Sequence, residues 1–137
     1  MVDIIWNWHP GLGLGPFKFN SNINDYMDTY NLEKNLEEVD VTDWITYGVP
    51  NTEISIDVEN DLVVSISSYD FFCFKNENII GMKLNKVLAL MLPHEYQVGE
   101  TTEYEDGDIQ TAYEFDELGL QIWESAGLIV GAACRSC

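Results

Sequence analysis

Residues 52–74 carry the pattern that most restricts how this chain folds. Ile54, Ile56 and Val58 alternate with polar side chains, and turn-forming residues at 59–62 lead into a second run rich in β-branched and aromatic residues. Strict alternation places every second side chain on the same face of a strand, so one face is buried and the other meets water. The segment therefore predicts a β-hairpin with one buried face.

The rest of the chain extends this sheet and adds short helices. Three further runs, at 109–117, 118–125 and 127–135, have the composition of strands and are separated by turn residues. Apolar residues recur at helical spacing over 22–31 and again over 84–92. Short helices combined with antiparallel hairpins predict an α+β fold. We expect a single domain spanning the whole chain, with a curved antiparallel sheet and two short helices.

A weak internal similarity predicts two half-repeats. Residues 14–30 and 79–92 both run from an apolar residue through glycine, a second apolar residue and lysine into a helix. Two helix-plus-sheet units explain this similarity, and so does coincidence over a short segment. We favour the two units, because both segments end in a helix that precedes strand-like runs.

The net charge limits the partners that such a fold can have. The 137 residues hold 24 Asp and Glu against 6 Lys and Arg, a formal charge of −18 at pH 7. Because 46% of the residues are hydrophobic, we expect a folded chain and not an acidic disordered tail. Repulsion among these charges destabilises a compact state, so something other than stability maintains the charge. Binding to a basic partner is the more specific explanation, and solubility is the simpler one. Nucleic acid and membranes are disfavoured as direct partners, since both require basic patches.

The glycine-rich stretch at 8–19 is interpreted as a structural corner. The spacing of Gly11, Gly13 and Gly15 does not fit a dinucleotide fingerprint, because the third glycine comes one residue too early. Lys18 does not fit a P-loop, because it lies between two phenylalanines and does not open a helix. Glycine permits positive φ and close backbone approach. We therefore expect these glycines to pack against the neighbouring tryptophans and to hold no phosphate.

No catalytic residue, cofactor or metal site is predicted. The acidic segment around Gly107 lacks the ligand positions of an EF-hand, and Cys134 and Cys137 form a lone C-x-x-C without a second pair. His94 has no second histidine at the spacing of a metalloprotease helix, and nucleophile motifs are absent. Carboxylate pairs occur in any chain this acidic, so a small acidic hydrolase using such a pair stays open as an alternative.

Cysteine usage and hydropathy indicate a cytoplasmic protein. Three cysteines are an odd number, which favours reduced thiols over a disulfide framework. No apolar run reaches the length of about 18 residues that a membrane-spanning helix needs.

Two acidic clusters with interleaved aromatic residues form the predicted partner-binding surface. Between Lys86 and Arg135 the sequence contains no lysine or arginine. Dense carboxylates repel one another, a cationic partner removes that cost, and aromatic anchors accompany charge at binding surfaces. The simpler interpretation is a solvated acidic face whose aromatic residues point inward. The candidates are Glu103, Tyr104, Glu105, Asp106 and Asp108, which we favour, and Glu37, Glu38, Asp40, Asp43 and Trp44.

Three short motifs resemble elements of small bacterial immunity domains: GLGLGPFKF at 11–19, NENIIGMKL at 76–84 and ELGLQIW at 117–123. Together with small size and strong acidity, they make the chain similar to the immunity proteins of bacterial polymorphic-toxin and contact-dependent growth inhibition systems. The resemblance implies a cognate toxin domain, often a basic nuclease, blocked by tight binding over its active site. It transfers no particular residue to this chain. A non-inhibitory interaction module and a nucleic-acid mimic remain as further alternatives.

Overall fold

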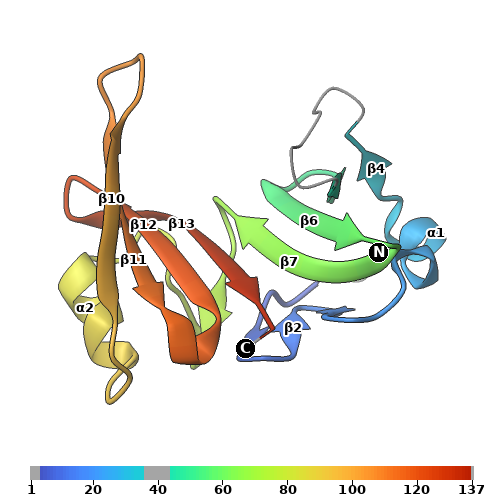
Figure 1. Cartoon of the computed structure of the whole chain (residues 1–137), viewed down its shortest axis with the longest axis horizontal. Helices are drawn as coiled ribbons and strands as arrows, with labels where there is room; N and C mark the ends of the chain where they lie inside the picture. The colour runs from blue at the N-terminus through green and yellow to red at the C-terminus, as the bar shows by residue number, and fades with distance from the viewer. Residues whose placement is uncertain (1–3, 36–43, 137) are drawn as a thin grey trace.

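The main element of the computed structural model, which describes residues 4–35 and 44–136, is an open eight-stranded antiparallel sheet (Figure 1). The strand order is β10-β11-β12-β13-β7-β6-β5-β4. This confirms the predicted α+β fold with a curved antiparallel sheet. The strands are β4 (Glu33–Lys34), β5 (Ile45–Gly48), β6 (Ile54–Glu59), β7 (Leu62–Ser68), β10 (Gln97–Glu103), β11 (Ile109–Phe115), β12 (Leu120–Ser125) and β13 (Leu128–Arg135).

Shorter elements pack beside this sheet. The helices are α1 (Met27–Tyr30), which follows the 3-10 turn η1 (Ile23–Asp25), and α2 (Leu84–Leu90); a second 3-10 turn, η2, covers Asp116–Leu118. Both predicted helices are therefore confirmed, although each is shorter than the sequence pattern indicated. Two small sheets complete the fold: β1 (Trp8–His9), β2 (Gly13–Leu14) and β3 (Phe17–Lys18) in one, and β8 (Cys73–Phe74) and β9 (Glu77–Asn78) in the other.

The predicted hairpin forms as β6 and β7, and its buried face is the predicted one. Ile54, Ile56 and Val58 are each no more than 1% exposed. The turn residues Asn60 and Asp61 both have positive φ, the conformation of a two-residue hairpin turn whose twist matches that of its strands. One continuous core joins these residues to the short sheets and to α2.

The glycine-rich stretch is a corner, as predicted. Gly15 has a φ of +57°, and a Cβ added there would lie 2.8 Å from the indole ring of Trp6. A Cβ on Gly13 would overlap the carbonyl oxygen of Phe17 on the paired strand. Glycine is needed at both positions because the backbone passes too close to its neighbours for any side chain.

The eight-stranded sheet consists of two similar halves, in agreement with the predicted half-repeats. Each half contains a short helix followed by a four-stranded meander, β4–β7 in the first and β10–β13 in the second. Tyr47 pairs with Ile56 in the first half, and Tyr113 pairs with Ile122, 66 positions later, in the second. Both meanders also shift register within their last hairpin, at Asp57/Val58 in β6–β7 and at Trp123/Glu124 in β12–β13.

The two halves meet through their last strands. In the β7–β13 pair Ser67 lies opposite Ala133, and these positions are again 66 residues apart. Ile66 faces Cys134 on one side of this pair, and Ala132 faces Ser68 on the other. With a spacing of 66 residues, Ile66 corresponds to Ala132 and Ser68 corresponds to Cys134, so each of these two pairs is the counterpart of the other. A local two-fold axis therefore passes between Ser67 and Ala133.

Candidate protein-binding surface

The β10–β11 hairpin projects from the sheet. β11 pairs with β12 only between Thr111 and Phe115, whereas its pairing with β10 continues to Ile109. The tip of the hairpin is therefore two-stranded and stands beyond the neighbouring strands (Figure 1). The sequence indicated only a polar, acidic segment before residue 109, and β10 was not predicted, because its polar residues lack the alternation that marks a half-buried strand.

The favoured acidic cluster forms the turn of this hairpin. The Tyr104 amide donates to the Asp108 carbonyl oxygen at 2.8 Å, and the Gly107 amide donates to the Tyr104 carbonyl oxygen at 2.9 Å. Gly107 has a φ of +88°, as a three-residue hairpin loop with a glycine bulge requires. The Asp106 carboxylate accepts from the Asp108 amide at 3.0 Å, which closes the turn further.

Asp108 also ties the hairpin to the neighbouring strand. Its carboxylate accepts hydrogen bonds from the Ser125 hydroxyl at the end of β12 and from the Gln110 side-chain amide at 2.9 Å. The bond from Ser125 lowers the pKa of Asp108 most, followed by the bond from Gln110, because both favour the ionised form. Asp108 therefore serves to hold the hairpin, and its carboxylate is less free for a partner than the sequence indicated.

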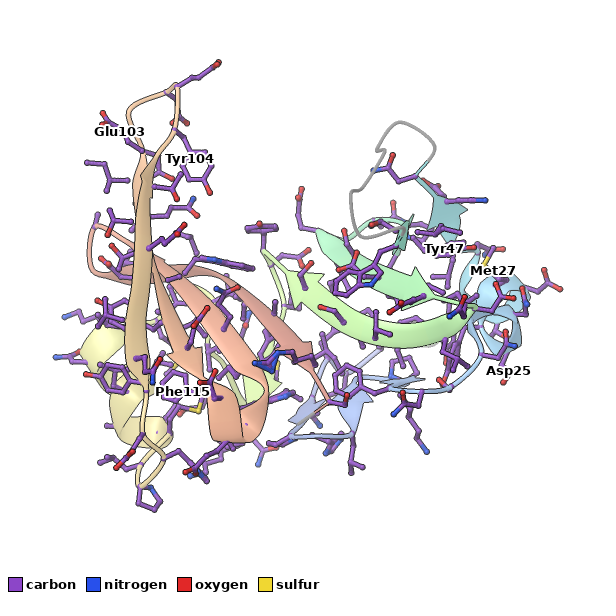
Figure 2. The ribbon with its side chains drawn as sticks, in the orientation of Figure 1. Asp25, Met27, Tyr47, Glu103, Tyr104 and Phe115 are labelled. Atoms are coloured by element: carbon purple, nitrogen blue, oxygen red, sulfur yellow. The ribbon has the colours of Figure 1, made fainter. Side chains whose placement is uncertain are left out.

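The other four candidates of this cluster face solvent. Glu103, Tyr104, Glu105 and Asp106 are exposed, and Tyr104 retains 48% of its accessible surface. Figure 2 shows Glu103 and Tyr104 on the projecting hairpin. The ion pairs seen over residues 4–35 and 44–136 are Lys86–Glu77, His94–Glu117 and Arg135–Asp116, so none of them neutralises a carboxylate of this turn. Apolar side chains accompany the charge on the same hairpin, since Val98 and Ile109 are also exposed.

A hollow of about 390 Å³ lies on one face of the hairpin, next to Tyr104. Its small residues include Gly99 and Ala112, where an added Cβ on Gly99 would lie 3.4 Å from the Ala112 methyl group. No lysine or arginine is among the residues that surround it. These are Gly99, Glu100, Thr102, Tyr104, Gln110, Ala112, Glu114, Gln121 and Trp123.

Trp123 supplies the large aromatic ring of this hollow. Its indole stacks on Tyr69, with 5.8 Å between ring centroids and 15° between planes. Tyr104 and Trp123 line the same hollow, so the three aromatic residues lie in one neighbourhood. Burial raises the pKa of Tyr69 most, and the nearby Tyr104 raises it further. Gln121 donates to the Glu114 carboxylate at 3.1 Å on the same face. We call the hollow that contains Glu100, Tyr104, Glu114, Gln121 and Trp123, with Tyr69 stacked on the indole, the acidic aromatic hollow.

Trp123 was not among the candidates from the sequence, although a signal for it exists. Leu120 and Ile122 are buried, so the alternation of β12 places Gln121 and Trp123 on the opposite face. That pattern predicts an aromatic residue on the open face of the sheet. Only the fold, however, brings it beside Tyr104 and Tyr69, which come from other strands and connections.

The second predicted cluster lies elsewhere. Trp44 precedes β5, which is separated from β11 in the sheet by β12, β13, β7 and β6. Its indole N–H donates to the Glu59 carboxylate at 3.3 Å, across the β5–β6 pair. The structure therefore does not place Trp44 beside the hairpin turn. The remaining residues of this cluster lie outside the described part of the chain: Glu37, Glu38, Asp40 and Asp43.

The described part of the chain shows no metal-binding arrangement. No three His, Cys, Asp or Glu side chains within residues 4–35 and 44–136 converge on a point that would hold a metal ion. Cys73 is half-buried and Cys134 buried, both as free thiols, and burial raises the pKa of each. Over the same residues, no helix has the length and apolar character to cross a membrane.

Comparison with protein families, curated proteins and solved structures found no match to this chain.

Proposed function

We propose that this chain is a binding protein for a basic protein partner, and that it acts as an immunity protein that neutralises a nuclease toxin domain. The observation that carries the proposal is the projecting β10–β11 hairpin, whose exposed acidic turn stands beside the acidic aromatic hollow. Binding surfaces combine aromatic anchors with complementary charge, and both are present here.

The chemistry of the hollow favours a cationic side chain. Glu100 and Glu114 provide negative charge, and Trp123 provides an aromatic face, beside which an arginine or lysine is stabilised by the ring quadrupole. Tyr69 supports the indole by stacking on it. An arginine is the better occupant, because its planar guanidinium stacks on rings and binds carboxylates through two hydrogen bonds at once.

Inhibition follows from the same charge. The cleft of a nuclease must accept phosphate groups, so it carries lysine and arginine side chains. The solvent-exposed carboxylates of Glu103 and Glu105 are suited to pair with such side chains. A projecting acidic hairpin that occupies this cleft would exclude the nucleic acid by competition for the same cations.

The test begins with the immobilised chain and a lysate of its source organism at low salt. The proposal expects one basic protein to be retained in a one-to-one ratio and its nuclease activity to fall to zero at one equivalent of this chain. Retention of no basic protein, or retention without loss of nuclease activity, would overturn the inhibitor function.

A pair of charge variants then tests the surface. Glu100, Glu103 and Glu105 are changed to Gln in one protein, and in the control Asp28 is changed to Asn and Glu33 and Glu53 to Gln. Both change the net charge equally, but only the first touches the hairpin. We expect association to slow about tenfold at low salt in the first variant, with a flatter salt dependence, and much less in the control. Equal on-rates would place the interface elsewhere.

A further inference from the structure

β10 has an unpaired edge over its full length. It is the first strand of the sheet, with β11 on one side, and all seven of its residues are exposed. Within residues 4–35 and 44–136, no other strand pairs with it and no isolated bridge reaches it. An exposed edge of this kind presents a row of backbone donors and acceptors to a further strand.

The hydrogen bonding of the turn identifies which backbone groups point outward. The Tyr104 amide donates to Asp108, so in the alternating antiparallel ladder the next hydrogen-bonded pair toward the base of the hairpin is Thr102 with Gln110. The pairs Thr101–Thr111 and Glu103–Ile109 are then the non-hydrogen-bonded ones. The N–H and C=O groups of Thr101 and Glu103 consequently face the open edge.

We infer that β10 receives an extended basic segment of the partner as an additional strand of the sheet. This inference rests on the proposed function and adds the manner of docking. Main-chain hydrogen bonds to Thr101 and Glu103 would provide affinity, and alternate side chains of the added strand would provide specificity.

The negative charge of β10 determines which kind of strand can pair with its open edge. Glu100 and Glu103 lie on β10, and opposite charges on neighbouring strands stabilise a pair whereas like charges destabilise it. A second copy of this chain would bring its own acidic edge and a net charge of −18, so pairing between copies is opposed. Glu100, Thr102 and Tyr104 face the acidic aromatic hollow, whereas Glu103 lies on the opposite face with Ile109. A strand with lysine or arginine at every second position presents these cations on one face, where they can lie beside Glu100 and Glu114 of the hollow.

The first test uses a synthetic strand as probe. A seven-residue peptide of alternating lysine and valine, blocked at both ends, is titrated into the protein, and amide hydrogen exchange is followed by NMR. Without peptide, the amides of Thr101 and Glu103 should exchange quickly, and saturation should slow them by about tenfold or more. A peptide of the same sequence and charge that is N-methylated at every residue has no main-chain N–H group to donate along either edge, and it is the control. Equal binding of the two peptides would overturn the strand pairing.

A pair of variants provides the second test, with the partner retained from the lysate. Thr101→Pro removes an amide that points to the open edge and leaves the β10–β11 ladder intact, whereas Thr101→Ala keeps that amide. Both lose the 3.1 Å contact between the hydroxyls of Thr101 and Thr111, so they form a matched pair. We expect Thr101→Pro to bind about tenfold more weakly than Thr101→Ala, at an unchanged salt dependence.

The outcomes separate the two proposals. Weakening by the charge variant with equal binding of Thr101→Pro and Thr101→Ala would retain the acidic interface and reject the added strand. Protein that sediments as a dimer through β10 would also reject it. Should Thr101→Pro lose its fold, as judged by circular dichroism, the amide exchange of the unmodified protein still decides the question.

Discussion

The phenol ring of Tyr69 lies against the indole of Trp123, and the backbone of Gly131 passes beside both rings. A Cβ added at Gly131 would come within 2.8 Å of each of them. Tyr69 follows β7, Trp123 lies in β12, and Gly131 belongs to β13 between them. The stack therefore spans the junction of the two halves of the sheet, beside the acidic aromatic hollow.

Gly131→Ala should separate this stack. The added methyl group has no room, so the rings must move, and overpacking of this kind costs about 1–3 kcal/mol. We expect a lower free energy of unfolding, a changed aromatic circular dichroism signal and weaker partner binding, because the Trp123 ring would shift. Gly48→Ala in β5 is the matched control, since its Cβ would come no closer than 3.9 Å to another atom and the residue lies away from the hollow. Similar losses in both variants would contradict the role of the stack.

Stability in acid should depend on Asp108. Its hydrogen bonds lower the pKa below the ordinary 3.8, so the folded state is stabilised when the carboxylate is ionised. That contribution is present above pH 3.8 and is lost as the pH falls through the lower folded-state pKa. Asp108→Asn should therefore flatten the dependence of the unfolding midpoint on pH below pH 3.8.

Two further variants serve as a partial test and as a control for the Asp108→Asn measurement. Ser125→Ala removes the hydrogen bond that lowers the Asp108 pKa most and should flatten the profile in part. Asp28→Asn makes the same charge change on α1, away from the hairpin, and serves as the control. An Asp108→Asn profile parallel to that of the unmodified protein would show that the carboxylate is not held as the structure describes.

The two halves should unfold as one unit. Ile56 and Ile122 are equivalent positions, both fully buried in the same continuous core, and β7 pairs with β13 between them. Ile56→Val and Ile122→Val should each lower the free energy of unfolding by about 0.5–1.5 kcal/mol. Urea unfolding followed by circular dichroism should show a single transition in each variant, with an unchanged slope. A second transition in either one would mean that the halves are independent.

Local patterns in the sequence determined several parts of this structure. Alternation located β6, β7 and the later strands, because the period of two reflects a half-buried strand whatever its partners are. Steric exclusion explains why Gly13 and Gly15 mark a corner and not a phosphate site. The charge of −18 belongs to the sequence alone and already indicated the class of partner that we propose.

Only the tertiary structure decided which of these residues act together. β10 has no hydrophobic alternation because both of its faces are exposed, so its strand conformation comes from pairing with β11. The pairing of Ser67 with Ala133 sets the two halves side by side and brings Tyr69 of the first half against Trp123 of the second. Strand order and register depend on contacts between distant segments, and a local pattern carries no information about which segments those are.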